Sequence, residues 1–244
     1  MIKVTVYNEF LHEKKSEKVR QIYPDGIHAA IAAFLGEEED ISVRTATLDM
    51  EECGLTQEVI DDTDVIIWWG HIAHEKVPDE VAERVRKAVW NGMGAIFLHS
   101  AHFSKPFRAL TGSPCNLCWR ESADSERIWV IEPNHPIAKG LDRFFDIPAV
   151  ETYGEPFGIP TPDRIVFMGW YSGGEVFRSG ITYERYNGRI FYFQPGHESF
   201  PIFYQKEIQT VIKNAVRWAY NPSRRSTAAP WVIKTDDPSK YVKK

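Results

Sequence analysis

Short apolar runs alternate with amphipathic stretches through the first hundred residues, and this order restricts the fold more than any other feature of the chain. Residues 64–69 (DVIIWW) and 94–99 (GAIFLH) are nearly continuous apolar runs, which is typical of strands covered on both faces. Residues 78–91 (PDEVAERVRKAVWN) open with proline and two acidic residues, and then place valines and alanines at helical spacing. The order predicts an α/β fold in which crossover helices join parallel strands.

The second half of the chain has a different pattern. Residues 126–132 and 164–171 are strand-like, and residues 175–195 predict a hairpin with Asn187-Gly188 as its turn. Residues 205–220 are amphipathic and predict a final helix.

The composition changes after Asn221-Pro222, where Ser, Thr, Arg, Pro and Lys become frequent. We therefore predict a single domain over residues 1–221 and a tail over residues 222–244. The tail contains Trp231 and could pack on a neighbouring subunit, so we expect a homo-oligomer.

Charge and hydropathy exclude several classes of protein. The formal net charge of −5 argues against nucleic-acid binding, which needs a basic surface. No segment approaches the roughly 18 apolar residues of a membrane span, and the N-terminus has no signal-peptide core. Three cysteines form an odd and sparse set, which is typical of a reducing compartment. We expect a cytoplasmic protein with neither a membrane nor a nucleic-acid partner.

Four of the eight histidines fall at or just past the ends of predicted strands. They are His71, His99, His102 and His197. Ligands of such sheets bind beyond the carboxyl ends of the strands, so we expect these imidazoles to converge. Imidazoles can bind a metal or transfer protons, although any one of them could also be an ordinary solvated loop residue. We predict all four as metal ligands, and His102 and His197 also as catalytic residues. His12, His28 and His135 carry no such signal.

Carboxylates and aromatic residues accompany these histidines. Glu198 adjoins His197, and Glu151 lies in a polar and aromatic stretch, so we predict both as catalytic residues. For either one, a solvated surface charge is the alternative. Acidic residues can also bind sugar hydroxyls, and a neighbouring Tyr or Trp ring can stack on a sugar ring. The predicted substrate-binding residues are His74, Ser100, Trp119, Arg120, Glu121 and Tyr153.

Two common cofactor signals are missing or incomplete. Neither a P-loop nor a G-x-G-x-x-G motif follows the first strand, so we expect no nucleotide cofactor. Cys115 and Cys118 form a C-x-x-C motif, but a structural zinc site would need a second pair of cysteines. We interpret this motif as structural or incidental.

Six long segments carry motifs that occur together in one known family. They are residues 64–77 (DVIIWWGHIAHEKV), 98–121 (LHSAHFSKPFRALTGSPCNLCWRE), 127–140 (RIWVIEPNHPIAKG), 151–160 (ETYGEPFGIP), 174–179 (GEVFRS) and 191–201 (FYFQPGHESFP). With these motifs, residues 1–221 resemble the trehalose-utilisation (ThuA-like) family. The resemblance implies a flavodoxin-like three-layer fold with a mostly parallel central sheet, similar to class I glutamine amidotransferases.

The resemblance also places a nucleophile elbow at residues 99–102 (HSAH), and it matches residues 194–198 (QPGHE) to the late histidine segment of that superfamily. The amidotransferase cysteine is absent from this elbow, so we do not expect amidotransferase activity. Ser100 with His197 as its base is a weak substitute, because Leu98 and His102 stand where a G-x-S-x-G motif has glycines.

The resemblance implies action on trehalose-related disaccharides or on keto-sugars made from them. We expect a metal-assisted hydrolase, lyase or isomerase, with zinc as the metal. The alternative is a non-catalytic sugar-binding or regulatory protein on an inactivated amidotransferase scaffold. A third hypothesis is a hydrolase with Ser100 or Cys115 as its nucleophile.

Overall fold

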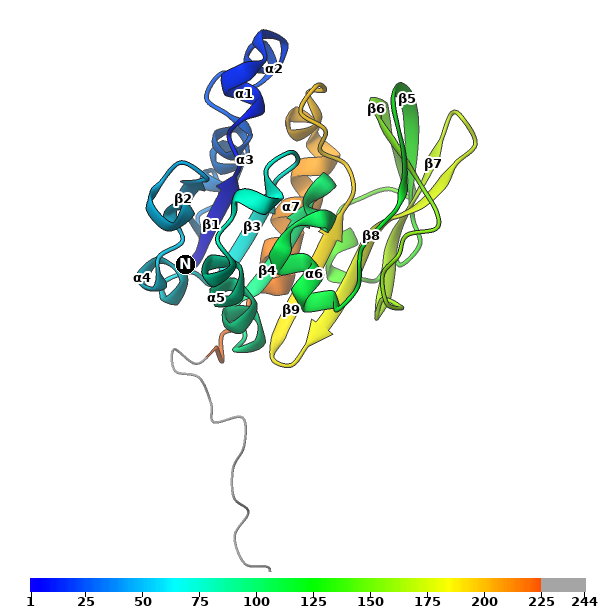
Figure 1. Cartoon of the computed structure of the whole chain (residues 1–244). Coiled ribbons are helices and arrows are strands. Elements are labelled where there is room, and N and C mark those ends of the chain that lie inside the picture. The colour runs from blue at the N-terminus through cyan, green and yellow to red at the C-terminus, as the bar shows by residue number, and fades with distance from the viewer. Residues whose placement is uncertain (225–244) are drawn as a thin grey trace, which may run out of the picture.

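A computed structural model describes residues 1–224, and within them the strands form one nine-stranded sheet (Figure 1). The strand order is β2-β1-β3-β4-β9-β8-β7-β5-β6. The strands are β1 (Ile2–Asn8), β2 (Ile41–Thr47), β3 (Val65–Trp69), β4 (Gly94–Leu98), β5 (Cys118–Val130), β6 (Phe144–Gly154), β7 (Arg164–Tyr171), β8 (Val176–Arg185) and β9 (Gly188–Phe193).

The sheet is parallel in one half and antiparallel in the other. The pairings from β2 to β9 in this order are parallel, and those from β9 to β6 are antiparallel. The expected α/β fold is confirmed, but the expectation of a mostly parallel sheet is wrong for the second half. There β8 and β9 form the predicted hairpin, but its two turn residues are Tyr186 and Asn187, because Gly188 already pairs with Arg185 as the first residue of β9. Short connections of this kind reverse the chain direction.

Helices cover both faces of the parallel half. Figure 1 shows α5 (Asp79–Trp90) and α6 (Lys105–Thr111) on one face, with α3 (Ile27–Gly36) and α7 (Lys206–Ala219) on the other. All five residues of β3 and of β4 are buried between these layers, which explains their continuous apolar sequences. The shorter helices are α1 (His12–Lys15), α2 (Glu17–Ile22) and α4 (Gln57–Asp61).

The predicted helices over residues 78–91 and 205–220 correspond to α5 and α7. The sequence patterns did not predict β6, and they predicted only the end of β5. β6 is the last strand of the sheet order, it contains Pro148, and its burial does not alternate regularly. A proline is tolerated in an edge strand because its missing N–H breaks no ladder there.

The parallel topology decides where the polar loops lie. β1, β3, β4 and β9 are neighbours or near neighbours in the sheet and point the same way, so the segments that follow them share one edge. No helix within residues 1–224 is long and apolar enough to cross a membrane. The predicted tail lies outside the described residues, apart from its first three positions.

Candidate functional site

His99 lies at the turn where β4 passes into a 3₁₀ helix, η3 (His99–Phe103). Its φ of 53° is uncommon for a residue with a side chain, and local strain of this kind persists only where the surroundings hold it. The ring is fully buried and stacks on Tyr153, with 5.1 Å between ring centroids. His99 therefore occupies the strained position of the elbow, one residue before Ser100.

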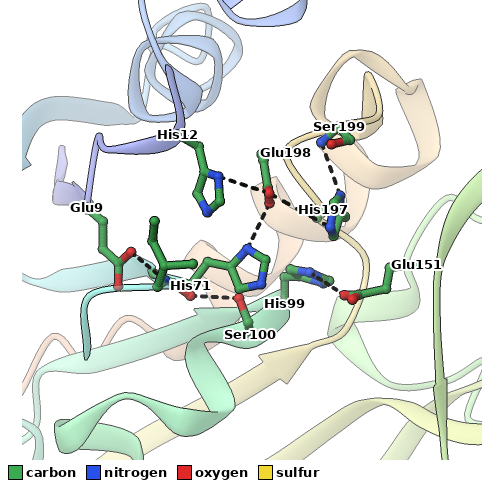
Figure 2. A network of polar contacts seen from close by, with 12 residues as sticks. Glu9, His12, His71, His99, Ser100, Glu151, His197, Glu198 and Ser199 are labelled. Carbon is green, nitrogen blue, oxygen red and sulfur yellow. Dashed lines mark hydrogen bonds and ion pairs between the residues drawn. The ribbon is translucent and has the colours of Figure 1, made fainter. Parts of the chain in front are cut away.

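Hydrogen-bond acceptors face both ring nitrogens of His99. Nδ1 lies 3.0 Å from the carbonyl oxygen of Gln194, and Nε2 lies 3.1 Å from Oε2 of Glu151 (Figure 2). A carbonyl oxygen only accepts, so Nδ1 carries a proton. Burial alone would raise the pKa of Glu151, but its hydrogen bond to His99 and the nearby imidazoles lower it. Nε2 therefore faces an oxygen of the buried Glu151 carboxylate.

A second cluster surrounds Glu198, which follows β9 and is 4% exposed. Its Oε2 lies 3.0 Å from Nδ1 of His71, and its Oε1 lies 3.2 Å from Nδ1 of His12 (Figure 2). The rings of His12 and His71 stack with 4.9 Å between centroids. Burial alone would lower the pKa of His71, but Glu198 more than offsets this and raises it. The same imidazoles hold the pKa of Glu198 far below its usual range against the opposing effect of burial.

His197 lies between the two clusters. Its ring centroid is 5.3 Å from that of His99 and 5.6 Å from that of His71. Nδ1 accepts a hydrogen bond from the backbone N–H of Ser199 at 3.1 Å, so the neutral ring carries its proton on Nε2. Burial is the main cause that lowers the pKa of His197 to about 4. At neutral pH this ring is an uncharged N–H donor.

His102 has the opposite tautomer. Its Nδ1 lies 2.8 Å from the carbonyl oxygen of Cys115 and must donate, which leaves Nε2 as an acceptor. Burial lowers the pKa of His102 to about 3, so the ring is neutral.

A pocket of about 390 Å³ opens beside both clusters. It is lined by His71, His74, Ser100, His102, Phe103, Asn116, Leu117, Trp119, Glu151 and Tyr153. Trp119 is 65% exposed, so its ring is free to stack on a ligand. Arg120 and Glu121 are not among the lining residues. Arg120 instead pairs with Asp124 at 2.6 Å and with Glu175, and Glu121 is exposed.

The neighbourhood offers two groups of residues that could hold a metal ion. One is His12, His71 and Glu198, and the other is His99, Glu151 and His197. Within each group the candidate ligand atoms lie within 4.8 Å of one another. The predicted ligands His71, His99 and His197 are thus divided between the groups, and His102 belongs to neither.

His12 and Glu9 are the two site residues that the sequence reasoning missed. Both follow β1, whose carboxyl end lies at the same edge as those of β3 and β4, and this position could have identified them. Glu9 is 1% exposed and accepts the backbone N–H groups of Ile72 and Ala73 at 2.9 and 3.0 Å. It thereby fixes the loop that carries His71 and His74, and Nδ1 of His74 is 3.7 Å away from Glu9 Oε1.

The two candidate nucleophiles are not activated in this structure. The Ser100 hydroxyl donates to the carbonyl oxygen of Gly70 at 2.8 Å rather than to an imidazole. The Cys115 thiol is buried, and burial raises its pKa, which disfavours the reactive thiolate.

Solved structures with this fold include two ThuA-like proteins. One, from Bacteroides uniformis ATCC 8492, is 18% identical, with 89% of this chain and 90% of that chain covered and a TM-score of 0.62. The other, from Parabacteroides merdae ATCC 43184, is 16% identical, with coverages of 94% and 93% and a TM-score of 0.62. Both are described as putative ThuA-like proteins.

A structure described as a putative GMP synthase component from Thermoplasma acidophilum is also similar, at 12% identity, coverages of 89% and 93%, and a TM-score of 0.55. This likeness supports the expected amidotransferase-like fold. A search of curated proteins finds no match. The family model for trehalose utilisation (ThuA) matches residues 3–219, nearly the whole of the described structure. The chain therefore belongs to the ThuA, or trehalose utilisation, family.

Proposed function

We propose that the chain is a metal-assisted enzyme that acts on trehalose-related disaccharides or on keto-sugars derived from them. Its family supports the substrate class. The observation that carries the chemistry is that Glu198 presents its two oxygens to two different imidazoles at the edge of the pocket.

His12, His71 and Glu198 would hold the divalent cation, with zinc as the expected metal. Two ligands of a tetrahedral zinc, each about 2.0–2.1 Å from the metal, lie roughly 3.3 Å apart. The nitrogen-to-oxygen distances of 3.0 and 3.2 Å in this group need little adjustment to reach that spacing. A bound cation would polarise a carbonyl or hydroxyl oxygen of the sugar.

The other group is better suited to proton transfer than to metal binding. Nδ1 of His197 is already an acceptor, so its Nε2 can donate a hydrogen bond to a sugar oxygen but has no lone pair for a metal. Glu151 is a buried carboxylate at the pocket wall, and it is the candidate base for an acidified sugar proton. His99 would orient Glu151 for this step. The His99 ring is itself held by the hydrogen bond from its Nδ1 to the carbonyl oxygen of Gln194.

The remaining pocket residues fit sugar binding. The neutral His102 offers an acceptor nitrogen for a hydroxyl group, and the exposed ring of Trp119 offers a stacking face. Apolar stacking with a few placed polar groups is the usual construction of small-molecule pockets.

The test combines metal analysis with turnover. Purified protein is loaded with zinc, assayed on 3-keto-trehalose, treated with a chelator, and assayed again after zinc is restored. We expect stoichiometric zinc, activity that follows it, and loss of both in a His12→Ala/His71→Ala variant. His135→Asn is the control, because an asparagine can keep the cap that His135 provides to Ile137.

One result would favour the non-catalytic alternative, which is supported by the absence of an activated nucleophile at the elbow. That result is sugar binding to the zinc-loaded chain with no turnover of any keto-disaccharide. Homo-oligomer formation and a cytoplasmic location stay predictions, and light scattering of the full chain would test the first.

A further inference from the structure

A buried carboxyl group lies beneath the site, on a strand that contributes nothing to the pocket beyond its first residues. Glu126 on β5 has no exposed surface, and its Oε1 accepts a hydrogen bond from the Ser179 hydroxyl at 2.8 Å. The carboxyl group lies over Gly169 of β7. A side chain there is excluded, because a Cβ on Gly169 would overlap Glu126 Oε1 and Ser179 Oγ. Gly169 therefore leaves room for Glu126 to reach across β7 toward β8 and β9.

Gln194, directly after β9, receives this carboxyl group. The neutral carboxyl group can donate from Oε2 to the amide oxygen of Gln194 over 3.0 Å, and the amide nitrogen of Gln194 then donates to the Tyr171 hydroxyl over 3.1 Å. The backbone carbonyl of the same residue accepts the Nδ1 proton of His99. A continuous set of hydrogen bonds thus runs from the core of the antiparallel half to the elbow of the parallel half.

The surroundings favour the neutral form of this carboxyl group. Burial raises the pKa of Glu126 to about 8, and hydrogen bonds from Ser179 and Tyr171 offset only part of that effect. Among the described residues, the titratable groups that interact with it are the hydroxyls of Tyr171 on β7 and Tyr192 on β9. Burial raises the pKa of both tyrosines well above their ordinary value, so neither supplies a charge.

We propose that Glu126 is a positioning residue for His99, and that its neutral carboxyl group holds Gln194 in the place where the Gln194 carbonyl orients the imidazole. This inference rests on the proposed function only in taking His99 as part of the site. When Glu126 ionises, a charge enters a core that offers it no cation among the groups above. We expect the carboxylate to draw in water or move, and Gln194 and His99 to lose their fixed geometry.

The test reads the His99 ring directly and needs no substrate. The full chain is labelled with ¹⁵N-histidine, and the ring signals are recorded by NMR from pH 6.5 to 9.5, with His99 assigned by its loss in His99→Asn. In the wild type, we expect the Nδ1–H signal of His99 to be present at neutral pH and to weaken with a midpoint near 8. In Glu126→Gln, which keeps the shape without the charge, the signal should persist to the alkaline end.

Glu126→Leu, which removes the hydrogen bonds, should weaken the His99 signal already at pH 7. Glu184→Gln, the same change at an exposed position, should behave like the wild type. The proposal fails if the alkaline midpoint is the same in the wild type and in Glu126→Gln. This comparison decides the question even if Glu126→Leu does not fold.

Activity on a keto-disaccharide separates this inference from the proposed function. If turnover exists, its alkaline limb should move upward in Glu126→Gln, with kcat changed more than KM. If there is no turnover but the NMR signals respond as expected, the positioning role stands and the proposed function falls.

Discussion

Glu198 and His71 are joined by a 3.0 Å contact although 127 positions separate them in the chain. His71 follows β3 and Glu198 follows β9, and one strand, β4, lies between these two in the sheet. The contact exists because parallel strands bring their carboxyl ends to one edge.

Replacing His71 with alanine should weaken zinc binding by at least tenfold. The substitution removes one of the three candidate ligands and leaves Glu198 with His12 at 3.2 Å and His197 at 3.8 Å. Competition between the protein and a chromogenic chelator measures the affinity. The His135→Asn control should bind zinc as the wild type does. An unchanged affinity in His71→Ala would mean that the cation, if any, binds elsewhere.

Replacing Glu9 with alanine should lower the free energy of unfolding by about 2 kcal/mol, because the backbone N–H groups of Ile72 and Ala73 lose their acceptor. The loop that carries His71 should also loosen, so zinc binding should weaken together with stability. Urea denaturation and chelator competition measure the two effects. A destabilised protein with unchanged zinc affinity would show that the loop does not position the metal ligands.

Replacing Gly169 with alanine should destabilise the protein by roughly 1–3 kcal/mol, because the new Cβ overlaps the Glu126 carboxyl group in a packed core. Adding Glu126→Ala should recover part of this loss, so the two substitutions should not be additive. Urea denaturation of the wild type, the two single variants and the double variant gives the four free energies of unfolding of a double-mutant cycle. Strict additivity would show that Gly169 and Glu126 do not compete for the same space.

The stability of the wild type should fall as the pH rises through the range set by Glu126. The unfolded carboxyl group ionises near pH 4.5 and the folded one only near 8, so the unfolded state gains charge first. The stabilisation that comes from the neutral Glu126 carboxyl group is therefore complete below pH 4.5 and is lost progressively up to pH 8, by about 1.4 kcal/mol per pH unit. The Glu126→Gln variant has no carboxyl group to ionise at this position, so its stability should not fall in this way. The difference in melting temperature between it and the wild type should grow from pH 5 to pH 8, and a constant difference would contradict the prediction.

Cysteine labelling should be fast at Cys118 and slow at Cys53 and Cys115. Cys118 is exposed, whereas the other two thiols are buried and burial raises their pKa. A thiol-reactive dye should label about one site per chain within minutes, and Cys118→Ser should abolish this fast phase. Rapid modification of Cys115 in the folded protein would restore the hypothesis that it is a nucleophile.

The strongly periodic elements were predictable because their sequences report burial directly. The runs around Ile67 and Ile96 are apolar at every position, since both faces of β3 and β4 are covered. β6 was not predictable in this way, because an edge strand with Pro148 carries a weak pattern. In the antiparallel half, the hairpin of β8 and β9 was predicted, but the pairing of β7 and β5 beside it was not. The pairing direction of strands far apart in the chain depends on how their connections close in space.

For the site, the sequence by itself determined that histidines gather at strand ends, because a loop residue after an apolar run can be located without coordinates. The sequence could not show which of these histidines contacts which carboxylate. Only the tertiary structure decided that His71 pairs with Glu198 while His99 pairs with Glu151, and it brought His12 into the first pair. Tautomers such as the Nε2–H form of His197 depend on single hydrogen bonds to the folded backbone. Contacts of this kind join distant segments, and no local pattern encodes them.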